Sequence, residues 1–346
     1  MRAGPAPHPP VDRTRPAISP ATDPPATQSA DPAAKHADFA AAVRAGLSKP
    51  YREIPARFLY DQQGSELFVA ITDLPEYYPT RTEIGLIEAH SAAIGAKVGK
   101  GRTVVEFGSG SSAKTPPFLR AVEAKHYVPI DISADFLADA AETVRQAVPD
   151  LQVHPLPGDF TNALSLPDAV RGEPLMGFFP GSTIGNMSAA ESVDLLRAFR
   201  ATLGQDAPLV IGIDLKKDVG VLEPAYDDGA GVTARFILGI LRRLRADLGA
   251  DLDESAWAYD SFWNADMGRI EMHVRAEEPT SITLGEDRYT FTRSERIHIS
   301  NSHKYSVEES ALLARAAGYH QTEAWRDSDA LFSLQLWHPL ADDLNW

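Results

Sequence analysis

The sequence predicts an α/β fold of the Rossmann type, with a mostly parallel, doubly wound sheet. An apolar run at 103–107 ends in glycines and leads into a segment that can begin a helix. A second apolar run at 126–131 ends in an acid, and later apolar runs alternate with segments of helical character. Strands that alternate with helices in this way are typical of parallel sheets with crossover helices.

Composition narrows the class of protein. The 346 residues suffice for one large domain with an insertion or small second domain, and the net charge of −15 disfavours a nucleic-acid partner. There is no cysteine, which excludes a disulfide framework and thiolate chemistry. No apolar run is long enough for a membrane span, and no secretion signal is apparent. We therefore expect a cytoplasmic monomer with a small-molecule substrate.

The chain begins with a segment that we expect to be disordered. Residues 1–36 are rich in Pro, Ala, Thr and Asp and have few large apolar side chains. From Asp38 onward, apolar residues recur at helical spacing, which predicts a short amphipathic helix. Aromatic residues then crowd beside Gly, Pro and charges at 58–68 and 74–83. This composition suits a binding rim, although half-buried tyrosines would look the same. We expect 37–85 to pack on a substrate domain.

The glycines after the first strand predict a cofactor loop. Gly108 and Gly110 let the backbone turn sharply and approach a ligand closely. Asp131 ends the next strand, where a ribose diol would lie. The third glycine of the dinucleotide fingerprint is missing. The Glu-Phe-Gly-Ser-Gly string instead resembles motif I of S-adenosylmethionine-dependent methyltransferases, and Asp159 with Phe160 follows a third apolar run, where such enzymes contact adenine.

The remaining core elements follow in order. Residues 134–148 and 188–203 read as crossover helices, the second with a capping box of Ser188 and Glu191. Further strands are expected at 175–180 and 208–214. Two C-terminal runs should close the sheet as an antiparallel hairpin, namely 320–325 and 331–337.

A long insertion separates the fifth strand from that hairpin. Residues 216–305 are too many for a simple connection and predict a small α+β substrate domain, leaving 86–215 and 306–346 as the core domain. Within the insertion we expect a helix at 231–248 and a strand at 269–275, with 289–292 as its hairpin partner. The run 297–305 completes the insertion.

Several strings together resemble one family. They are 58–61 (Phe-Leu-Tyr-Asp), 74–83 (Leu-Pro-Glu-Tyr-Tyr-Pro-Thr-Arg-Thr-Glu), 106–110, 181–186 (Gly-Ser-Thr-Ile-Gly-Asn) and 225–228 (Ala-Tyr-Asp-Asp). In this order they are similar to the histidine Nα-methyltransferases of ergothioneine biosynthesis, over about 38–338. Relatives in that family act on tryptophan derivatives. The resemblance implies a Rossmann-like methyltransferase fold, S-adenosylmethionine as cofactor, and conversion of L-histidine to trimethylhistidine (hercynine).

The resemblance also implies site residues. Asn186, Tyr77 and Tyr226 match positions that hold the amino-acid backbone, and Tyr60 matches one that lines the same pocket. Asn186 alternatively caps the helix that begins near residue 188. Met272 is expected on the pocket wall, or as core filler. The positions that match cofactor contacts are Gly108, Lys114, Asp131, Asp159 and Phe160. No metal is required, because methyl transfer mainly needs alignment in a dry site.

One position departs from the family. Ser300 stands where the histidine-specific enzymes carry a glutamate that binds the imidazole together with the serine matching Ser302. A serine hydroxyl can still accept from an imidazole N–H, but losing a charged partner typically costs roughly 1.5–3 kcal/mol. His303 or a water could compensate, or the pocket could take another amino acid such as tryptophan. The reaction class is unaffected.

Two further classes of protein compete with this interpretation. A cofactor-binding protein without catalysis would keep the glycine loop, but retention of Asn186, Tyr77 and Tyr226 argues against it. An NAD-dependent dehydrogenase is disfavoured by the missing third glycine and by the aromatic-rich entry segment.

Overall fold

A computed structural model describes residues 32–110, 114–132 and 134–341, so most of the expected disordered tail lies outside the described residues. Its larger sheet has the strand order β12-β13-β6-β5-β1-β2-β3, with β4 also paired to β2. Strand β13 runs antiparallel to both of its neighbours, and the other neighbouring strands pair in parallel. These strands are β1 (Thr103–Phe107), β2 (His126–Asp131), β3 (Gln152–Val153), β4 (Leu156–Pro157), β5 (Leu175–Phe179), β6 (Leu209–Asp214), β12 (Tyr319–Arg326) and β13 (Phe332–Pro339).

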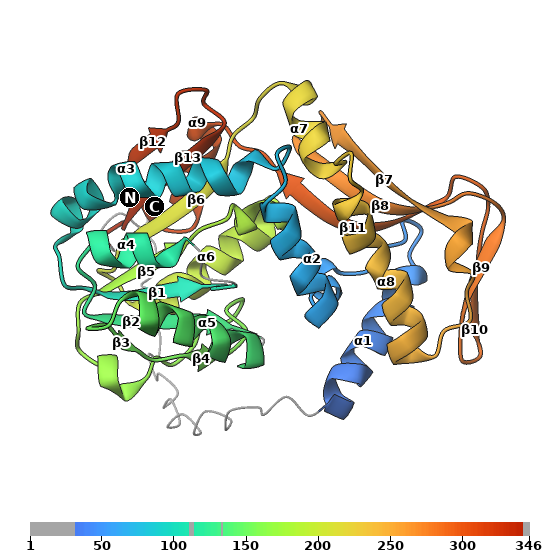
Figure 1. The fold of residues 1–346 in the computed structure, drawn as a ribbon, viewed down its shortest axis with the longest axis horizontal. Coiled ribbons are helices and arrows are strands. Elements are labelled where there is room, and N and C mark those ends of the chain that lie inside the picture. The colour runs from blue at the N-terminus through green and yellow to red at the C-terminus, as the bar shows by residue number, and fades with distance from the viewer. Residues whose placement is uncertain (1–31, 111–113, 133, 342–346) are drawn as a thin grey trace, which may run out of the picture.

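Helices cover both faces of this sheet (Figure 1). On one face, apolar residues of α3 (Tyr78–Val98), α4 (Thr115–Ala121) and α5 (Ala134–Ala147) share a core with the strands. On the other, α6 (Ala189–Leu203) and α9 (Val307–Ala316) do so. The predicted capping box of α6 is present, because Ser188 and Glu191 bond each other's backbone N–H groups. The predicted Rossmann-like fold with its C-terminal hairpin is confirmed.

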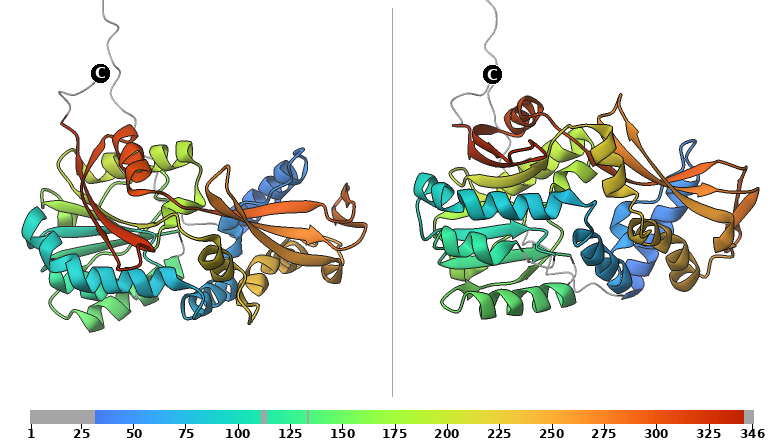
Figure 2. Two further views of the ribbon diagram at one scale, coloured as in Figure 1. Left: turned by 90° about the horizontal axis from the view of Figure 1, so that it is seen from above. Right: turned by 45° about the horizontal axis from the view of Figure 1, so that its top comes forward.

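The second part of the chain is built on a separate antiparallel sheet, which lies beside the larger one in both views of Figure 2. This sheet has the order β11-β8-β7, and β9 forms a two-stranded sheet with β10. Short 3-10 turns are η1 (Ala56–Leu59), η2 (Asp168–Val170), η3 (Thr183–Asn186) and η4 (Glu254–Ala256). The other elements are α7 (Val219–Tyr226), α8 (Val232–Leu248), β7 (Trp257–Asn264), β8 (Arg269–Ala276), β9 (Thr280–Leu284), β10 (Asp287–Phe291) and β11 (Arg296–His303).

The N-terminal helices share one apolar core with this second sheet. Helices α1 (Pro32–Leu47) and α2 (Gln62–Thr72) contribute Phe39, Val43 and Ile71 to a cluster that also contains residues of α8 and β8. Arg243 on α8 donates to the carbonyl oxygen of Phe58, which adds a polar tie to the apolar contact. Segments about 200 residues apart in the chain are therefore packed as one body.

Two expectations about these elements were wrong. The segment 289–292 does not pair with 269–275, because β10 folds back on β9 through a tight turn in which Gly285 adopts a φ of +64°. The partners of β8 are β7 and β11. Helix α1 also begins earlier than expected, at Pro32, because proline is favoured in the first helical turn and the alanines that follow have high helix propensity.

In the described ranges, no helix combines the length and the apolar character that crossing a lipid bilayer requires.

Stability at mildly acidic pH should depend on His273, which is buried on the second sheet. Burial, together with the nearby His298, lowers the pKa of His273 to about 4. An unfolded histidine titrates near pH ~6.5, so between these values the unfolded state binds more protons and stability falls as the pH is lowered. Between pH 7 and pH 5 the free energy of unfolding should drop by about 2 kcal/mol from this group. Urea denaturation at pH 7 and pH 5 measures it.

The variant His273→Gln should flatten that pH dependence, whereas replacing the exposed His320 by glutamine should leave it unchanged. An unaltered slope in His273→Gln would assign the acid sensitivity to other groups.

Candidate active site

The glycine loop lies at the carboxyl end of β1. Gly108 adopts a φ of +75°, and its N–H donates to the carbonyl oxygen of Ile130 at 2.9 Å. The carboxylate of Asp131 accepts from the N–H of Gly110 at 3.3 Å, which ties the loop to the end of β2. A Cβ atom at Gly108 would lie 3.3 Å from the Phe160 ring, so only glycine leaves this space open. The loop therefore has the shape needed to hold a cofactor.

Phe160 and Asp159 follow the short strand β4. The Phe160 ring packs edge-on against Phe179, with ring centroids 6.2 Å apart, and faces Gly108. Asp159 is exposed, and its carboxylate accepts from the N–H and the hydroxyl of Thr161 at 3.0 and 2.6 Å. The apolar ring is thus beside the loop, while the acid is fixed at the surface by its own turn.

Lys114 makes an ion pair with a buried acid. Its Nζ lies 2.5 Å from Oε2 of Glu83, which is fully buried on α3 and also accepts from the N–H of Gly181. The Glu83 carboxylate fills the space beside β6, since a Cβ at Gly212 would lie 1.9 Å from Oε1. This pair joins the segment after the glycine loop to the ends of β5 and β6. A contact between Lys114 and the cofactor stays a prediction.

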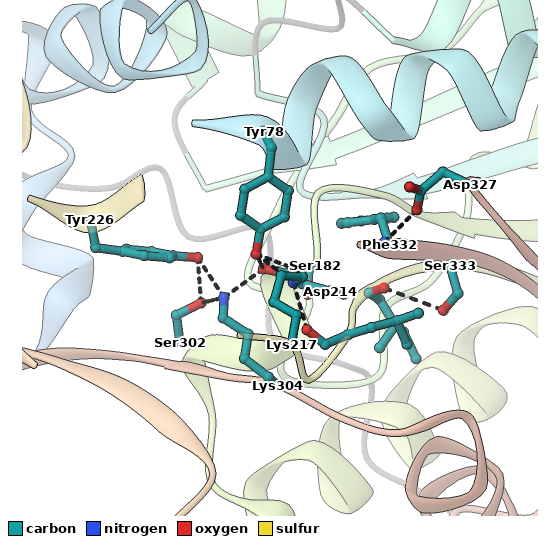
Figure 3. A network of polar contacts seen from close by, with 12 residues as sticks. Tyr78, Ser182, Asp214, Lys217, Tyr226, Ser302, Lys304, Asp327, Phe332 and Ser333 are labelled. Carbon is teal, nitrogen blue, oxygen red and sulfur yellow. Dashed lines mark hydrogen bonds and ion pairs between the residues drawn. The ribbon is translucent and has the colours of Figure 1, made fainter. Parts of the chain in front are cut away.

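A buried polar network connects the two sheets at the end of β6 (Figure 3). Asp214 accepts from the hydroxyl of Tyr78 at 2.8 and 2.9 Å, and from the ammonium groups of Lys217 and Lys304. The Lys304 Nζ is 2.6 Å from Oδ2 of Asp214. Burial lowers the pKa of Lys217 to about 8, against the opposing effect of the Asp214 charge. One carboxylate is thus the hydrogen-bond acceptor and counter-charge of two buried lysines.

Tyr226 continues the network toward β11. Its hydroxyl lies 2.6 Å from Nζ of Lys304 and 2.8 Å from Oγ of Ser302. The ring of Tyr77 packs against it edge-on, with centroids 6.0 Å apart. Burial raises the pKa of Tyr226 and of Tyr77 well above the usual range, and the charge of Asp214 adds to both shifts. Both tyrosines therefore stay protonated at neutral pH and act as hydrogen-bonding groups.

Tyr60 lies between the apolar core of the second sheet, which includes Phe236, and the cofactor loop. Its ring makes edge contacts with Phe68 and Phe236, at centroid distances of 5.7 and 5.5 Å. The residue keeps 44% of its surface exposed. Nevertheless, the protein around its hydroxyl, together with the negative charge of Asp131, raises the pKa of Tyr60 to about 12. The N-terminal segment thus extends close to the acid at the end of β2.

Ser300, Ser302 and Met272 share one face of the second sheet. Ser300 pairs with Met272 and Ser302 with Ile270, after an irregularity between 298 and 300. All four side chains are buried. The Ser300 hydroxyl lies 3.5 Å from the carbonyl oxygen of Asn301, at the long limit for a hydrogen bond. Met272 belongs to the apolar core shared with α8, so it serves as core whatever its role in a pocket.

Asn186 lies at the end of η3, beside β11. The carbonyl oxygen of the preceding Gly185 accepts from the Nδ1–H of His303 at 2.9 Å. A Cβ at Gly185 would clash with the His303 carbonyl oxygen at 2.8 Å. Asn186 itself is exposed. The N-cap of α6 is Ser188, so the alternative in which Asn186 caps this helix is wrong.

Four members of the network are absent from the residues that the sequence predicted for the site: Tyr78, Asp214, Lys217 and Lys304. Asp214 carried the same signal as Asp131, an acid at the carboxyl end of an apolar strand. Lys304 follows Ser300 and Ser302 at the two-residue spacing that places side chains on one face of a strand. The first signal points to the carboxyl edge of the large sheet, and the second to one face of the segment that includes β11 and the residue after it.

A doubly wound sheet with a glycine loop and an acid ending the second strand defines a protein that binds a nucleotide-like cofactor at the carboxyl edge of its strands. Comparison with known proteins specifies the class further. A profile described as histidine-specific methyltransferase, SAM-dependent, matches residues 39–339, and the chain belongs to this family. It is an S-adenosylmethionine-dependent methyltransferase, and the resemblance in the sequence is confirmed.

Two mycobacterial relatives agree with this assignment. A histidine N-alpha-methyltransferase of Mycolicibacterium smegmatis is 37% identical over 85% of this chain and 92% of its own length. One of Mycobacterium tuberculosis is 35% identical with the same coverage. Ergothioneine biosynthesis protein 1 of Schizosaccharomyces pombe is 28% identical over 81% of this chain and 38% of its own. Among solved structures, a magnesium protoporphyrin IX methyltransferase of Synechocystis matches with a TM-score of 0.44 and 10% identity, over 82% of this chain and 97% of its own.

Proposed function

We propose that the protein transfers methyl groups from S-adenosylmethionine to the α-amino nitrogen of a free amino acid. The substrate in this proposal is L-histidine, and the product is trimethylhistidine for ergothioneine biosynthesis. The names of the two mycobacterial relatives support histidine as the substrate. Within the chain, the observation that carries the proposal is the cluster of Tyr77, Tyr226 and Ser302 at the carboxyl edge of the cofactor sheet.

The cofactor side of the site fits S-adenosylmethionine. Because Gly108 has no side chain, the space between its backbone and the Phe160 ring stays open. Asp131 offers a carboxylate to a ribose diol. When bound, the cofactor supplies the methyl group as an electrophile. We propose that Gly108, Asp131 and Phe160 hold it, with Asp159 and Lys114 nearby.

The amino-acid side has to orient a nitrogen and keep water out. In the proposal, Asn186, Tyr77 and Tyr226 hold the amino-acid backbone, while Tyr60 lines the pocket. Since Tyr77 and Tyr226 stay protonated, they position the substrate and do not accept its proton. The α-ammonium must lose a proton before each attack, and a low-dielectric site favours that loss by disfavouring the charged form.

Ser300 favours a second candidate within the same reaction class. The hydroxyl is buried, makes one long contact and carries no charge, so it holds an imidazole N–H less strongly than a carboxylate does. An amino acid with a larger apolar ring, such as tryptophan, would rely more on the flexible Met272 beside it. In this candidate, the enzyme is an Nα-methyltransferase for that amino acid.

An amino-acid panel tests both candidates. The purified protein and the variant Ser300→Glu are incubated with S-adenosylmethionine and each of the twenty amino acids, and products are read by mass. We expect histidine to gain three methyl groups fastest, and Ser300→Glu to raise kcat/KM for histidine by about tenfold, the effect of one charged hydrogen bond. Inert histidine with a methylated tryptophan would select the second candidate. Silence across the panel, with the cofactor bound, would overturn the proposal.

A further inference from the structure

We propose that Lys304 is a positioning residue of the amino-acid site. It donates to the hydroxyls of Tyr226 and Ser302 and orients them so that Ser302 donates to Tyr226, which leaves the Tyr226 O–H to donate to the carboxylate of the substrate. This inference rests on the proposed function, because it takes the substrate to be a free amino acid.

The first step concerns the donors of Lys304. Its side chain is fully buried, so none of its hydrogen bonds goes to bulk water. An ammonium group has three N–H donors. They go to Oδ2 of Asp214 at 2.6 Å, the hydroxyl of Tyr226 at 2.6 Å and Oγ of Ser302 at 2.7 Å. All three donors are therefore used, and both hydroxyl oxygens act as acceptors toward the lysine.

The second step counts the hydroxyl protons. Tyr226 and Ser302 carry one proton each, and their oxygens lie 2.8 Å apart, so one hydroxyl donates to the other. Among the described residues, neither oxygen has another acceptor in hydrogen-bonding distance. When Ser302 is the donor within this pair, the proton of Tyr226 is left over and can be donated to a ligand, while a lone pair of Ser302 stays open to an imidazole N–H. Figure 3 shows both hydroxyls converging on the lysine from two different elements.

The third step concerns charge. Lys304 and Lys217 contribute two positive charges below pH ~8, where Lys217 is protonated. Asp214 and Asp327, whose charges both act on Lys217, contribute two negative charges. The side chains of Lys304, Lys217 and Asp214 are at most 6% exposed, so solvent and salt screen them little. The ammonium group of Lys304, which donates to both hydroxyls and so polarises them, and the spare O–H donor both favour an anionic acceptor. A carboxylate meets these requirements, and an amine without a carboxylate does not.

Binding to two ligands that differ only in the carboxylate tests this inference. Calorimetry at pH 7 measures L-histidine and histamine, or the corresponding pair for the preferred amino acid, on protein saturated with S-adenosylhomocysteine. We expect Lys304→Met to weaken binding of the amino acid by about tenfold or more, the loss expected for a charge-assisted contact, and to change binding of the amine much less. Lys216→Met serves as a matched control, because the Lys216 side chain is exposed. This variant should prefer the amino acid over the amine to the same degree as the unaltered protein.

Two further variants separate the explanations. Lys217→Met removes the other ammonium group that pairs with Asp214 and leaves the hydroxyls of Tyr226 and Ser302 untouched. It should therefore reduce the preference for the amino acid over the amine less than Lys304→Met does. Equal effects would show that charge alone sets the preference, which overturns the donor role of Lys304. If Lys304→Met does not fold, Tyr226→Phe should instead show the reduced preference for the amino acid over the amine. If Tyr226→Phe keeps the full preference, the inference is also overturned. An unaltered protein that binds no amino acid at all would refute the proposed function itself.

Discussion

Replacing Asp214 by asparagine should lower the free energy of unfolding by about 3–5 kcal/mol, the range found when one partner of a buried ion pair is removed. Asp214 is buried and accepts from Lys217, Lys304 and Tyr78. The asparagine keeps the shape but leaves two buried ammonium groups without a counter-charge. Since a folded protein is typically stable by only about 5–15 kcal/mol, urea denaturation should show a large shift of the midpoint.

Glu309→Gln is the matched control for this measurement. Glu309 pairs with Lys216, and both side chains are more than 40% exposed. A pair of this kind contributes about 0–1 kcal/mol, because solvent screens the charges. If Asp214→Asn were no more destabilising than Glu309→Gln, the buried network would not be holding the two sheets together as described.

The second large effect concerns cofactor binding. Asp131→Asn should weaken binding of S-adenosylhomocysteine by about 10- to 100-fold, since hydrogen bonds to charged groups are worth about 1.5–3 kcal/mol. In the proposed cofactor site, the change removes a charged acceptor for the ribose diol, and it also weakens the contact that fixes the N–H of Gly110. Calorimetry on the two proteins measures the difference.

Asp150→Asn provides the control, because Asp150 is an exposed acid outside the site. Its affinity for S-adenosylhomocysteine should match that of the unaltered protein. If Asp131→Asn retained full affinity for S-adenosylhomocysteine, the assignment of the ribose contact to Asp131 would be wrong.

Local sequence was sufficient for much of the cofactor half of the molecule. The strand, glycine loop and acid lie within one stretch, 103–131. Residue types there indicate the local backbone conformation directly, as Gly108 does by allowing a positive φ. The same is true of the capping box at Ser188. The expected hairpin at 289–292 failed because several short strands lie close together in sequence, and pairing depends on the turn between β9 and β10.

The sequence by itself determined the fold class and the family of this protein, because strand and helix periodicity, glycine positions and ordered motifs are local properties of the chain. Only the tertiary structure decided how the site is held together. Lys304 meets Asp214 across 90 residues and Tyr226 across 78, and Glu83 meets Gly181 across 98. Such partners are chosen by burial, since a charge removed from water needs a compensating group from whatever element packs beside it. That choice leaves no periodic trace in the sequence.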